Sequence, residues 1–444
     1  MRKISSERNF ASLWPAREEE TLYVDVTHTW GTELQTGIQR VVRQLVTSWY
    51  SSNTNITLII FQEGKYKVLP SSALANFAVL YSARIPKGHN CKLRIFNLLL
   101  PFYLRIKRLI NRRWIRIILG LRFFKFERNF LTNHWTPKDS SIMNPTNAKI
   151  LILDLVFDPT QIAYLKEVSV NFGAEISFLS YDCNPLNAPQ YWPKEVSESF
   201  INYISLVNYS KRVWSISRTA QDDIKKFSNA DIDKISFNFK WLPPFDFPAC
   251  AHDNPLVRGL EEEEFILMVA SYVPSKNHLG FLRALQLLRT RGITIPKVYF
   301  VGGGSWISAE IDSKIRELSN LGIQVAKYEA IENCCLGRFY ENCTFSILPS
   351  FIEGFGLPIV ESLSFGKPVV TSDSTSMGEL LVLPGTIGFS HEQSPNLEEI
   401  LERLMSEREL LETLTAGALE VRDALGTWQE YAADLYKFVM GNRQ

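Results

Sequence analysis

Short apolar runs alternate with stretches of helical periodicity along most of this chain. Most runs end at a glycine, a proline or a polar turn, which is typical of strands buried on both faces of a parallel sheet. Helical patterns lie between them, as in Ile38, Val41, Leu45 and Trp49. The alternation predicts an α/β fold. The predicted strands are Leu22–Val26, Ile56–Phe61, Tyr66–Leu69, Ala148–Leu155, Ile176–Leu179, Val213–Ile216, Phe265–Ala270, Val298–Val301, Val325–Tyr328, Phe345–Leu348 and Val369–Ser372.

A change of composition divides the pattern into two halves. Prolines and the acidic run Glu261–Glu264 replace the periodic core positions after Trp241, which is typical of an interdomain linker. A chain of 444 residues is long enough for two or three domains. We predict a flexible lead, an N-terminal domain, a linker, a C-terminal domain and a last helix at residues 1–20, 21–245, 246–264, 265–420 and 421–444.

Composition and targeting signals narrow the class of protein. A hydrophobic content of 45%, a charged content of 21% and a net charge of +1 are typical of a globular protein with a full core, and give no general signal for nucleic acid. The six cysteines show no metal-ligand spacing, which indicates a reducing compartment. Residues 1–20 lack the apolar core of a secretory signal, and no apolar stretch reaches the roughly 18 residues that spanning requires. The prediction is a cytoplasmic protein, free or bound to a membrane face.

Residues 91–128 differ from the rest of the chain in charge. From Lys92 to Arg128 there are 11 Lys and Arg against one acid, Glu127, and aromatic residues lie between them. Such a segment is typical of a surface that binds anionic lipid, where each basic residue contributes about 1 kcal/mol. The alternative is a helix pair packed on its own domain with a solvated basic face. No nucleic-acid-binding motif accompanies the charge, so we do not predict nucleic acid as a partner.

The most informative stretch is residues 345–373. A predicted strand, Phe345–Leu348, leads through a glycine-containing turn to a helix that begins near Pro358. This arrangement offers free backbone N–H groups to an anion. Glu353 on the turn and Glu361 on the helix can face one cleft, and carboxylates in such a place need hydroxyl donors, which suggests a sugar nucleotide. The alternative is an ordinary βα unit with surface carboxylates.

The stretch Glu353-Gly-Phe-Gly-Leu-Pro-Ile-Val-Glu361 resembles the Glu-x7-Glu signature of retaining GT-B glycosyltransferases of sequence family four. Gly366-Lys367-Pro368 and Met377-Gly378-Glu379 fit the same pattern. The resemblance covers residues 265–390 well and the N-terminal half only at 22–43 and 176–186. It implies two Rossmann-like domains that face across a cleft, with the C-terminal helix crossing back onto the N-terminal domain.

The resemblance also implies roles for individual residues. Glu361 would accept hydrogen bonds from the ribose, Glu353 would hold donor-sugar hydroxyls, and Lys276 would stabilise the departing diphosphate. Ser275 stands where the family's PRKN loop has an arginine, and Tyr181 stands where its HDxxP loop has a histidine. The predicted catalytic residues are Glu353, Lys276 and Asp182, and the predicted nucleotide-sugar contacts are Glu361, Gly354, Phe355, Gly356, Leu357, Gly37 and Gly303.

Alternatives accompany several of these residues. Gly37 lies in the stretch TGIQRVVR, which resembles the opening of many family members, and the preceding Thr36 suits either an N-cap or a ligand contact. Gly303 would allow close approach of a nucleotide, or simply form a tight turn. Lys276 could be a solvent-facing loop lysine. Arg338 and Tyr340 are weaker candidates for the base pocket. We expect the two glutamates and Lys276 to converge on one anion site between the domains.

The predicted function is transfer of a hexose, with retention, from a nucleotide sugar to a glycan or polyprenyl-diphosphate-linked acceptor at the inner membrane face. The nucleotide sugar is a co-substrate, and neither a further cofactor nor a metal is predicted. GDP-mannose is favoured by analogy over rhamnose, fucose, glucose or N-acetylhexosamine donors. One alternative is a catalytically silent GT-B scaffold of a polysaccharide assembly complex. Tyr181 and Ser275 favour it, and the retention of Glu353, Glu361 and Lys276 argues against it. Another is a peripheral lipid-binding module.

Overall fold

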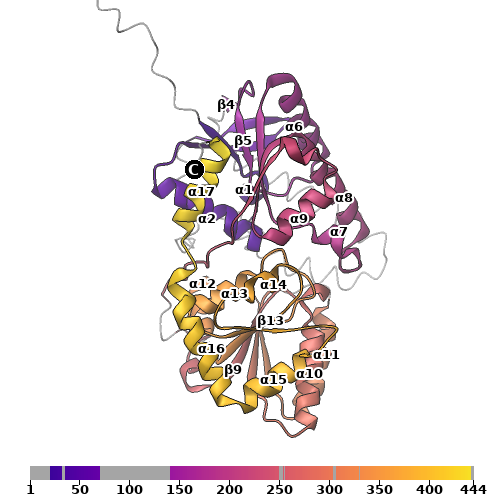
Figure 1. Ribbon diagram of the computed structural model, residues 1–444, viewed down its shortest axis with the longest axis vertical. Helices are drawn as coiled ribbons and strands as arrows, with labels where there is room; N and C mark the ends of the chain where they lie inside the picture. Colours follow the sequence, from indigo (N-terminus) through magenta and orange to yellow (C-terminus); the bar gives the residue numbers. More distant parts are fainter. Residues whose placement is uncertain are drawn as a thin grey trace, which may run out of the picture.

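The computed structural model describes residues 21–32, 36–70, 141–249, 254, 256–303, 307–329 and 331–441. These residues form two α/β units, one above the other in Figure 1. The predicted membrane-facing segment, 91–128, and the predicted lead, 1–20, lie outside the described residues. Among the helices of the described ranges, none is both long and apolar enough to cross a membrane.

The N-terminal unit contains an eight-stranded sheet in the order β4-β3-β2-β1-β5-β6-β7-β8. All neighbouring strands are parallel except the β2–β3 and β3–β4 pairs. The carboxyl ends of the parallel strands therefore share one edge, where open α/β sheets bind ligands. The strands are β1 (Leu22–Asp25), β2 (Ile56–Gln62), β3 (Lys65–Val68), β4 (Ser141–Ile142), β5 (Lys149–Ile152), β6 (Glu175–Ser180), β7 (Ser210–Ser215) and β8 (Ser236–Phe239).

Local signals in the sequence explain the helices of this unit. Asp158 caps α6 by accepting a hydrogen bond from Thr160 N, and the helix ends at Gly173, whose φ is 67°. Ser217 caps α9 in the same way through Ala220 N, as its position in the sequence predicts. The helices are α1 (Thr27–Trp30), α2 (Gly37–Ser51), α6 (Pro159–Phe172), α7 (Asn184–Asn187), α8 (Lys194–Ile204) and α9 (Arg218–Phe227).

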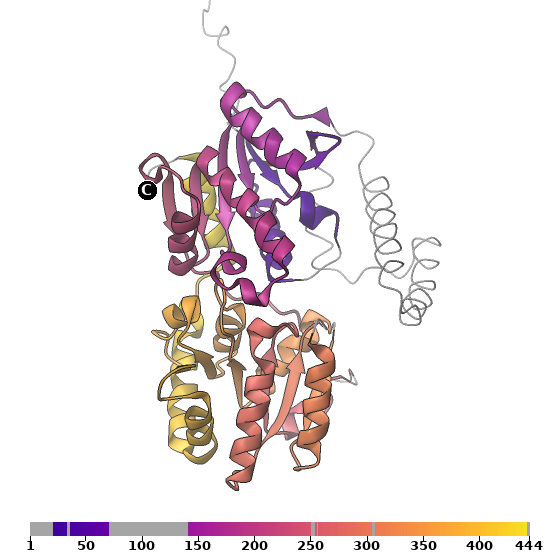
Figure 2. The same cartoon turned by 90° about the vertical axis from the view of Figure 1, so that its right-hand side faces the viewer.

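The C-terminal unit is a doubly wound sheet of six parallel strands in the order β11-β10-β9-β12-β13-β14. Figures 1 and 2 show helices on both of its faces. The strands are β9 (Phe265–Val269), β10 (Lys297–Val301), β11 (Val325–Tyr328), β12 (Phe345–Leu348), β13 (Val369–Ser372) and β14 (Thr386–Phe389). The helices are α10 (His278–Thr290), α11 (Ser308–Ser319), α12 (Asn333–Asn342), α13 (Leu357–Ser364), α14 (Thr375–Leu380), α15 (Leu397–Ser406) and α16 (Arg408–Val421).

The last helix, α17 (Trp428–Met440), packs on the N-terminal unit beside α2 (Figure 1). Trp49 Nε1 donates a hydrogen bond to Ala432 O at 2.9 Å, and Trp214 Nε1 donates to the Tyr431 hydroxyl at 2.8 Å. The predicted crossing of the C-terminal helix is thereby confirmed.

A continuous apolar cluster joins the two units. It contains Val24 and Tyr181 from the N-terminal unit, Phe355 and Ile359 from the C-terminal unit, and Tyr431 from α17. The loops that follow the parallel strands of each sheet meet around this cluster, so the carboxyl-end edges of the two sheets face each other.

Candidate active site

Two predicted site residues form an ion pair at the carboxyl-end edge of the C-terminal sheet. Lys276 ends a short 3-10 segment after β9, and Glu353 lies in the loop after β12. Lys276 Nζ lies 2.6 Å from Glu353 Oε1, and the Ser350 hydroxyl donates to the same oxygen at 2.7 Å. Only 21% and 14% of the two charged side chains are exposed. Among the described residues, Glu353 Oε2 has no protein hydrogen-bond partner, so it can accept a bond from a ligand hydroxyl.

Ser275, at the position where a second cation would be expected, is buried. Its backbone carbonyl accepts a hydrogen bond from Phe351 N at 2.8 Å, which ties the β9 loop to the signature loop. Ser275 therefore joins the loop after β9 to the loop after β12. Lys276 is the charged group that the loop after β9 contributes to the site.

Gly354 brings the signature loop into contact with the N-terminal unit. A Cβ atom built at this position would lie 2.6 Å from Asp182 Oδ2 and 2.9 Å from Tyr181 O. The Ser217 hydroxyl donates to Gly354 O at 2.8 Å from the start of α9. The structure thus places the predicted Asp182 directly against the predicted Gly354, and only glycine fits between the loops.

We predict that Gly354→Ala lowers activity at least about tenfold, because the added methyl group forces the signature loop away from Asp182. The matched control is Gly31→Ala, since a Cβ there would lie 3.7 Å from Thr27 O, an ordinary contact distance. Steady-state transfer rates and melting temperatures of both variants check the prediction. A Gly354→Ala protein with unchanged kcat and KM would contradict it.

Asp182 and Tyr181 are neighbours in the sequence, but their side chains make different hydrogen bonds. Burial raises the pKa of Asp182 to about 6, against the opposing effects of the Asn184 N–H and Lys276. Its Oδ1 accepts a hydrogen bond from Asn184 N at 3.0 Å. The buried Tyr181 hydroxyl donates to Leu153 O at 2.9 Å, so this side chain stabilises the sheet edge.

The amino ends of two helices meet between the units. A Cβ at Gly37, the first residue of α2, would lie 3.6 Å from Leu357 Cδ1, and Leu357 is the first residue of α13. Gly356 precedes α13 with a φ of 105°, which requires glycine. Thr36 occupies the N-cap position of α2 but makes no side-chain capping bond. First-turn N–H groups and the helix dipoles make this point favourable for an anion.

Glu361 is paired separately from Lys276 and Glu353. It lies on α13, is 1% exposed, and has both carboxylate oxygens hydrogen bonded. Arg40 Nη2 of α2 donates to Oε1 at 2.8 Å, and the buried Tyr340 hydroxyl donates to Oε2 at 2.7 Å. The expected convergence therefore holds for Lys276 and Glu353, whereas Glu361 is held by a cation from the other unit. Sequence reasoning did not identify Arg40.

The other predicted contacts are placed as follows. Phe355 is buried in the cluster between the units. Gly303 follows β10, its carbonyl accepts a bond from Tyr272 N at 3.1 Å, and a Cβ there would meet open space. The neighbouring Gly302 is the position that requires glycine, because a Cβ built there would lie 1.9 Å from Ala270 O. Arg338 pairs with Glu341 at 2.6 Å.

Glu379 forms a further contact between the units, and sequence reasoning did not predict it. Its carboxylate accepts hydrogen bonds from Thr219 N at 2.6 Å and Arg218 N at 3.1 Å, at the amino end of α9. Trp241 Nε1 also donates to it, at 3.1 Å. A carboxylate of the C-terminal unit thus caps a helix of the N-terminal unit.

Two buried carboxyls, Asp25 and Asp154, lie at the carboxyl ends of β1 and β5 in the N-terminal unit. Asp154 accepts hydrogen bonds from Thr29 N at 2.9 Å and Thr29 Oγ1 at 2.6 Å, which holds α1 against β5. Asp25 accepts from the Tyr66 hydroxyl and from Gln161 Nε2, both at 2.8 Å. Burial raises the pKa of both carboxyls to about 6.

This raised pKa of Asp154 predicts a pH dependence of stability. Folding favours the protonated form, so the contribution of Asp154 is full below its unfolded pKa of about 4 and is lost as pH rises through about 6. The free energy of unfolding of Asp154→Asn, relative to wild type, should rise over this window by up to about 3 kcal/mol. Urea titrations at pH 4 to 7 measure it, with the exposed Asp233→Asn as control. A difference for Asp154→Asn that stays constant with pH would refute the assignment.

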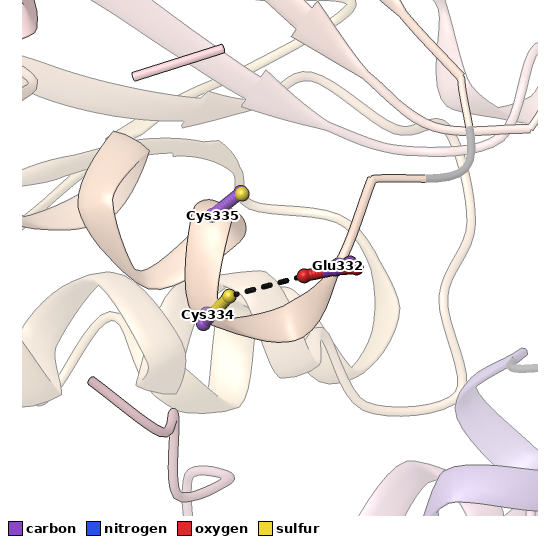
Figure 3. A group of neighbouring side chains, drawn as sticks. All are labelled: Glu332, Cys334 and Cys335. Carbon is purple, nitrogen blue, oxygen red and sulfur yellow. Dashed lines mark hydrogen bonds between the residues drawn. The ribbon is translucent and has the colours of Figure 1, made fainter. Parts of the chain in front are cut away.

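One group of described side chains has ligand atoms close enough for a metal ion: Glu332, Cys334 and Cys335, within 4.8 Å of one another. Figure 3 shows Cys335 directed away from the contact between Cys334 and Glu332. Cys335 Sγ instead accepts from Asn254 Nδ2 at 3.1 Å. The side chains do not converge as metal ligands do, and the absence of a metal from the reaction stays a prediction.

Comparison with known proteins finds a family that resembles the C-terminal unit. Residues 257–420 match the model of the family described as glycosyl transferases group 1. The match covers the C-terminal unit, including Lys276, Glu353 and Glu361.

Curated proteins similar to the chain include enzymes named for the O-antigen chain. The chain is 25% identical over 236 residues to the O-antigen chain mannosyltransferase B of Escherichia coli, which covers 51% of this chain and 60% of that protein. It spans less than two thirds of the length of the curated relatives it matches.

Solved structures show the fold of the whole chain. HepE of Anabaena, solved with UDP and glucose, matches with a TM-score of 0.60 and 12% identity, over 95% of this chain and 100% of that one. WaaG, a glycosyltransferase of lipopolysaccharide biosynthesis, matches with a TM-score of 0.56 and 14% identity, over 93% and 99%. The predicted GT-B fold is confirmed.

Proposed function

We propose that this protein is a retaining hexosyltransferase that moves a sugar from a nucleotide sugar to a glycan or lipid-linked acceptor. The observation that carries the proposal is the pairing of Lys276 with Glu353 beside Asp182 and the facing helix ends. This arrangement supplies an anion site, a cation and a carboxylate acceptor at one place between the two units.

The leaving group defines the first task of the site. As the bond between the anomeric carbon and the diphosphate breaks, negative charge grows on the phosphate oxygens. Lys276 and the first-turn N–H groups of α13 and α2 would stabilise that charge, in positions fixed before the reaction. Glu353, whose Oε1 is held by Lys276 and Ser350, would accept donor-sugar hydroxyls through Oε2.

The stereochemical course is the second task. In our proposal the acceptor hydroxyl attacks the anomeric carbon on the face that the diphosphate leaves, and its proton passes to a departing phosphate oxygen. Asp182 lies against Gly354, next to Glu353 in the signature loop, and in our proposal it holds a substrate hydroxyl. Closure of the units around Gly354 would exclude water and so limit hydrolysis of the donor.

The sugar and the acceptor are inferred from the relatives. Their names support a mannosyl donor, with GDP-mannose first, and an O-antigen or related surface polysaccharide as the product. Residues 91–128 would hold the enzyme on the inner face of the cytoplasmic membrane, where a polyprenyl-diphosphate-linked acceptor is exposed.

A thermal-shift screen with GDP-, UDP- and dTDP-sugars tests donor use. A ligand at about 100 times its Kd stabilises the folded state by about 2.7 kcal/mol, so the correct base should give a clear rise in Tm. NMR of the transferred sugar then reports the anomeric configuration, and retention is expected. A folded protein that responds to none of these sugars would contradict the proposal and favour a scaffold role.

A further inference from the structure

The contact between Arg40 and Glu361 links the two units at the helix that carries the second signature glutamate. We propose that Arg40 is a positioning residue for nucleotide binding: it fixes the carboxylate of Glu361 in the orientation that accepts ribose hydroxyls. This inference rests on the proposed function, which gives Glu361 its ribose contact. It adds that a side chain of the N-terminal unit controls that contact.

The geometry fixes the carboxylate without using all of its acceptor capacity. Arg40 Nη2 donates to Oε1 at 2.8 Å and the Tyr340 hydroxyl donates to Oε2 at 2.7 Å. Each carboxylate oxygen can accept about two hydrogen bonds, so these two donors leave one acceptor site unused on each oxygen. Two donors on different oxygens set the plane of the carboxylate and leave Glu361 oriented before a ligand binds.

Arg40 supplies the charge that a buried carboxylate requires. Glu361 is 1% exposed and Arg40 is 12% exposed, so neither group is stabilised mainly by water. A carboxylate in such a place is costly unless a cation pairs with it, and Tyr340 contributes a neutral donor only. Arg40 belongs to α2, so this charge balance exists only while the two units are together.

The guanidinium is itself held where the chain crosses between the units. It lies 3.9 Å from the centroid of the Phe245 ring, and Phe245 stacks on Trp428 with centroids 5.1 Å apart. Phe245 follows β8 in the linker, and Trp428 begins α17. The planar guanidinium can lie over the ring and pair with the carboxylate at the same time, whereas the ammonium of a lysine lacks this flat, forked shape. A change in the relative position of the two units would therefore move the Arg40 guanidinium relative to Glu361.

The test compares ligands that differ only in their ribose hydroxyls. Calorimetry on the full chain would measure the Kd of GDP and UDP, of their 2′,3′-dideoxy forms, and of pyrophosphate. For wild type we expect the dideoxy form of the preferred nucleotide to bind at least about tenfold more weakly. In Arg40→Gln the intact nucleotide should weaken by about the same factor, pyrophosphate should bind as before, and the dideoxy penalty should shrink to about twofold.

Two further variants keep the outcome decisive. Lys240→Gln removes a different ion pair, between the residue after β8 and Asp434 of α17 at 2.6 Å, and should leave every Kd unchanged. Arg40→Lys keeps the charge and decides the question by the same comparison if Arg40→Gln does not fold. An equal dideoxy penalty in wild type and Arg40 variants overturns this inference alone. A folded wild type that binds neither nucleotide overturns the proposed function and this inference together.

Discussion

Replacing Lys276 with alanine should lower kcat about 100- to 1,000-fold, the usual effect of removing one preorganised group that stabilises developing charge. Lys276 Nζ lies 2.6 Å from Glu353 Oε1, so the variant loses a cation and also releases the carboxylate proposed to hold the donor sugar. The loss should appear mainly in kcat, because the diphosphate carries its largest charge in the transition state.

The control for Lys276→Ala is Lys297→Ala. Lys297 is the first residue of β10, at the opposite end of the strands of the same sheet. Lys297 pairs with Glu263 at 3.0 Å and both side chains are partly exposed, so its removal should change stability little. Radiolabelled transfer assays measure both variants. A Lys276→Ala enzyme whose kcat stays within threefold of wild type would remove Lys276 from the proposed mechanism, and with it much of the case against a scaffold.

Trp428→Ala should produce the largest loss of stability, about 3–5 kcal/mol, as expected for removing a fully packed tryptophan. Trp428 is 2% exposed, stacks on Phe245, and donates through Nε1 to Pro244 O at 2.9 Å. The substitution leaves a cavity between the linker and α17 and frees a buried carbonyl.

Denaturant unfolding measures this effect, with Gln429→Ala as control because Gln429 is exposed on the same helix. Since Phe245 also supports Arg40, nucleotide affinity should fall together with stability. A Trp428→Ala protein within 1 kcal/mol of the control would show that α17 contributes little to joining the units.

The sequence predicted most interior strands of both sheets because they are short apolar runs buried on both faces, and it predicted β3 from its turn with β2. It missed β4, β8 and β14, which lie at sheet edges, where burial is lower and the apolar pattern is weaker. The predicted strand Ala148–Leu155 was too long: β5 ends at Ile152. Asp154 instead turns to bond Thr29, a contact between residues 125 apart in sequence.

The candidate site was predictable where its residues lie in stretches that resemble the family. Lys276 follows β9 and Glu353 follows β12, and both loops belong to the C-terminal unit, which the resemblance covers. Arg40 and Glu361 are 321 residues apart, and their pairing depends on how the units meet. One signal was present in the sequence: Arg40 lies in the first turn of the helix that begins at Gly37, at the sheet edge where the sequence predicts ligand binding.

The return of α17 to the first sheet also sets the order in which the molecule is completed during synthesis. Trp49 and Trp214 have hydrogen-bond partners on α17, which leaves the ribosome after the strands of both sheets. The N-terminal unit therefore lacks these packing partners until Trp428–Met440 has emerged, by which time the strands and helices of the C-terminal unit up to Val421 have already been made. A stop codon introduced just before Trp428 would thus damage the unit that is synthesised first.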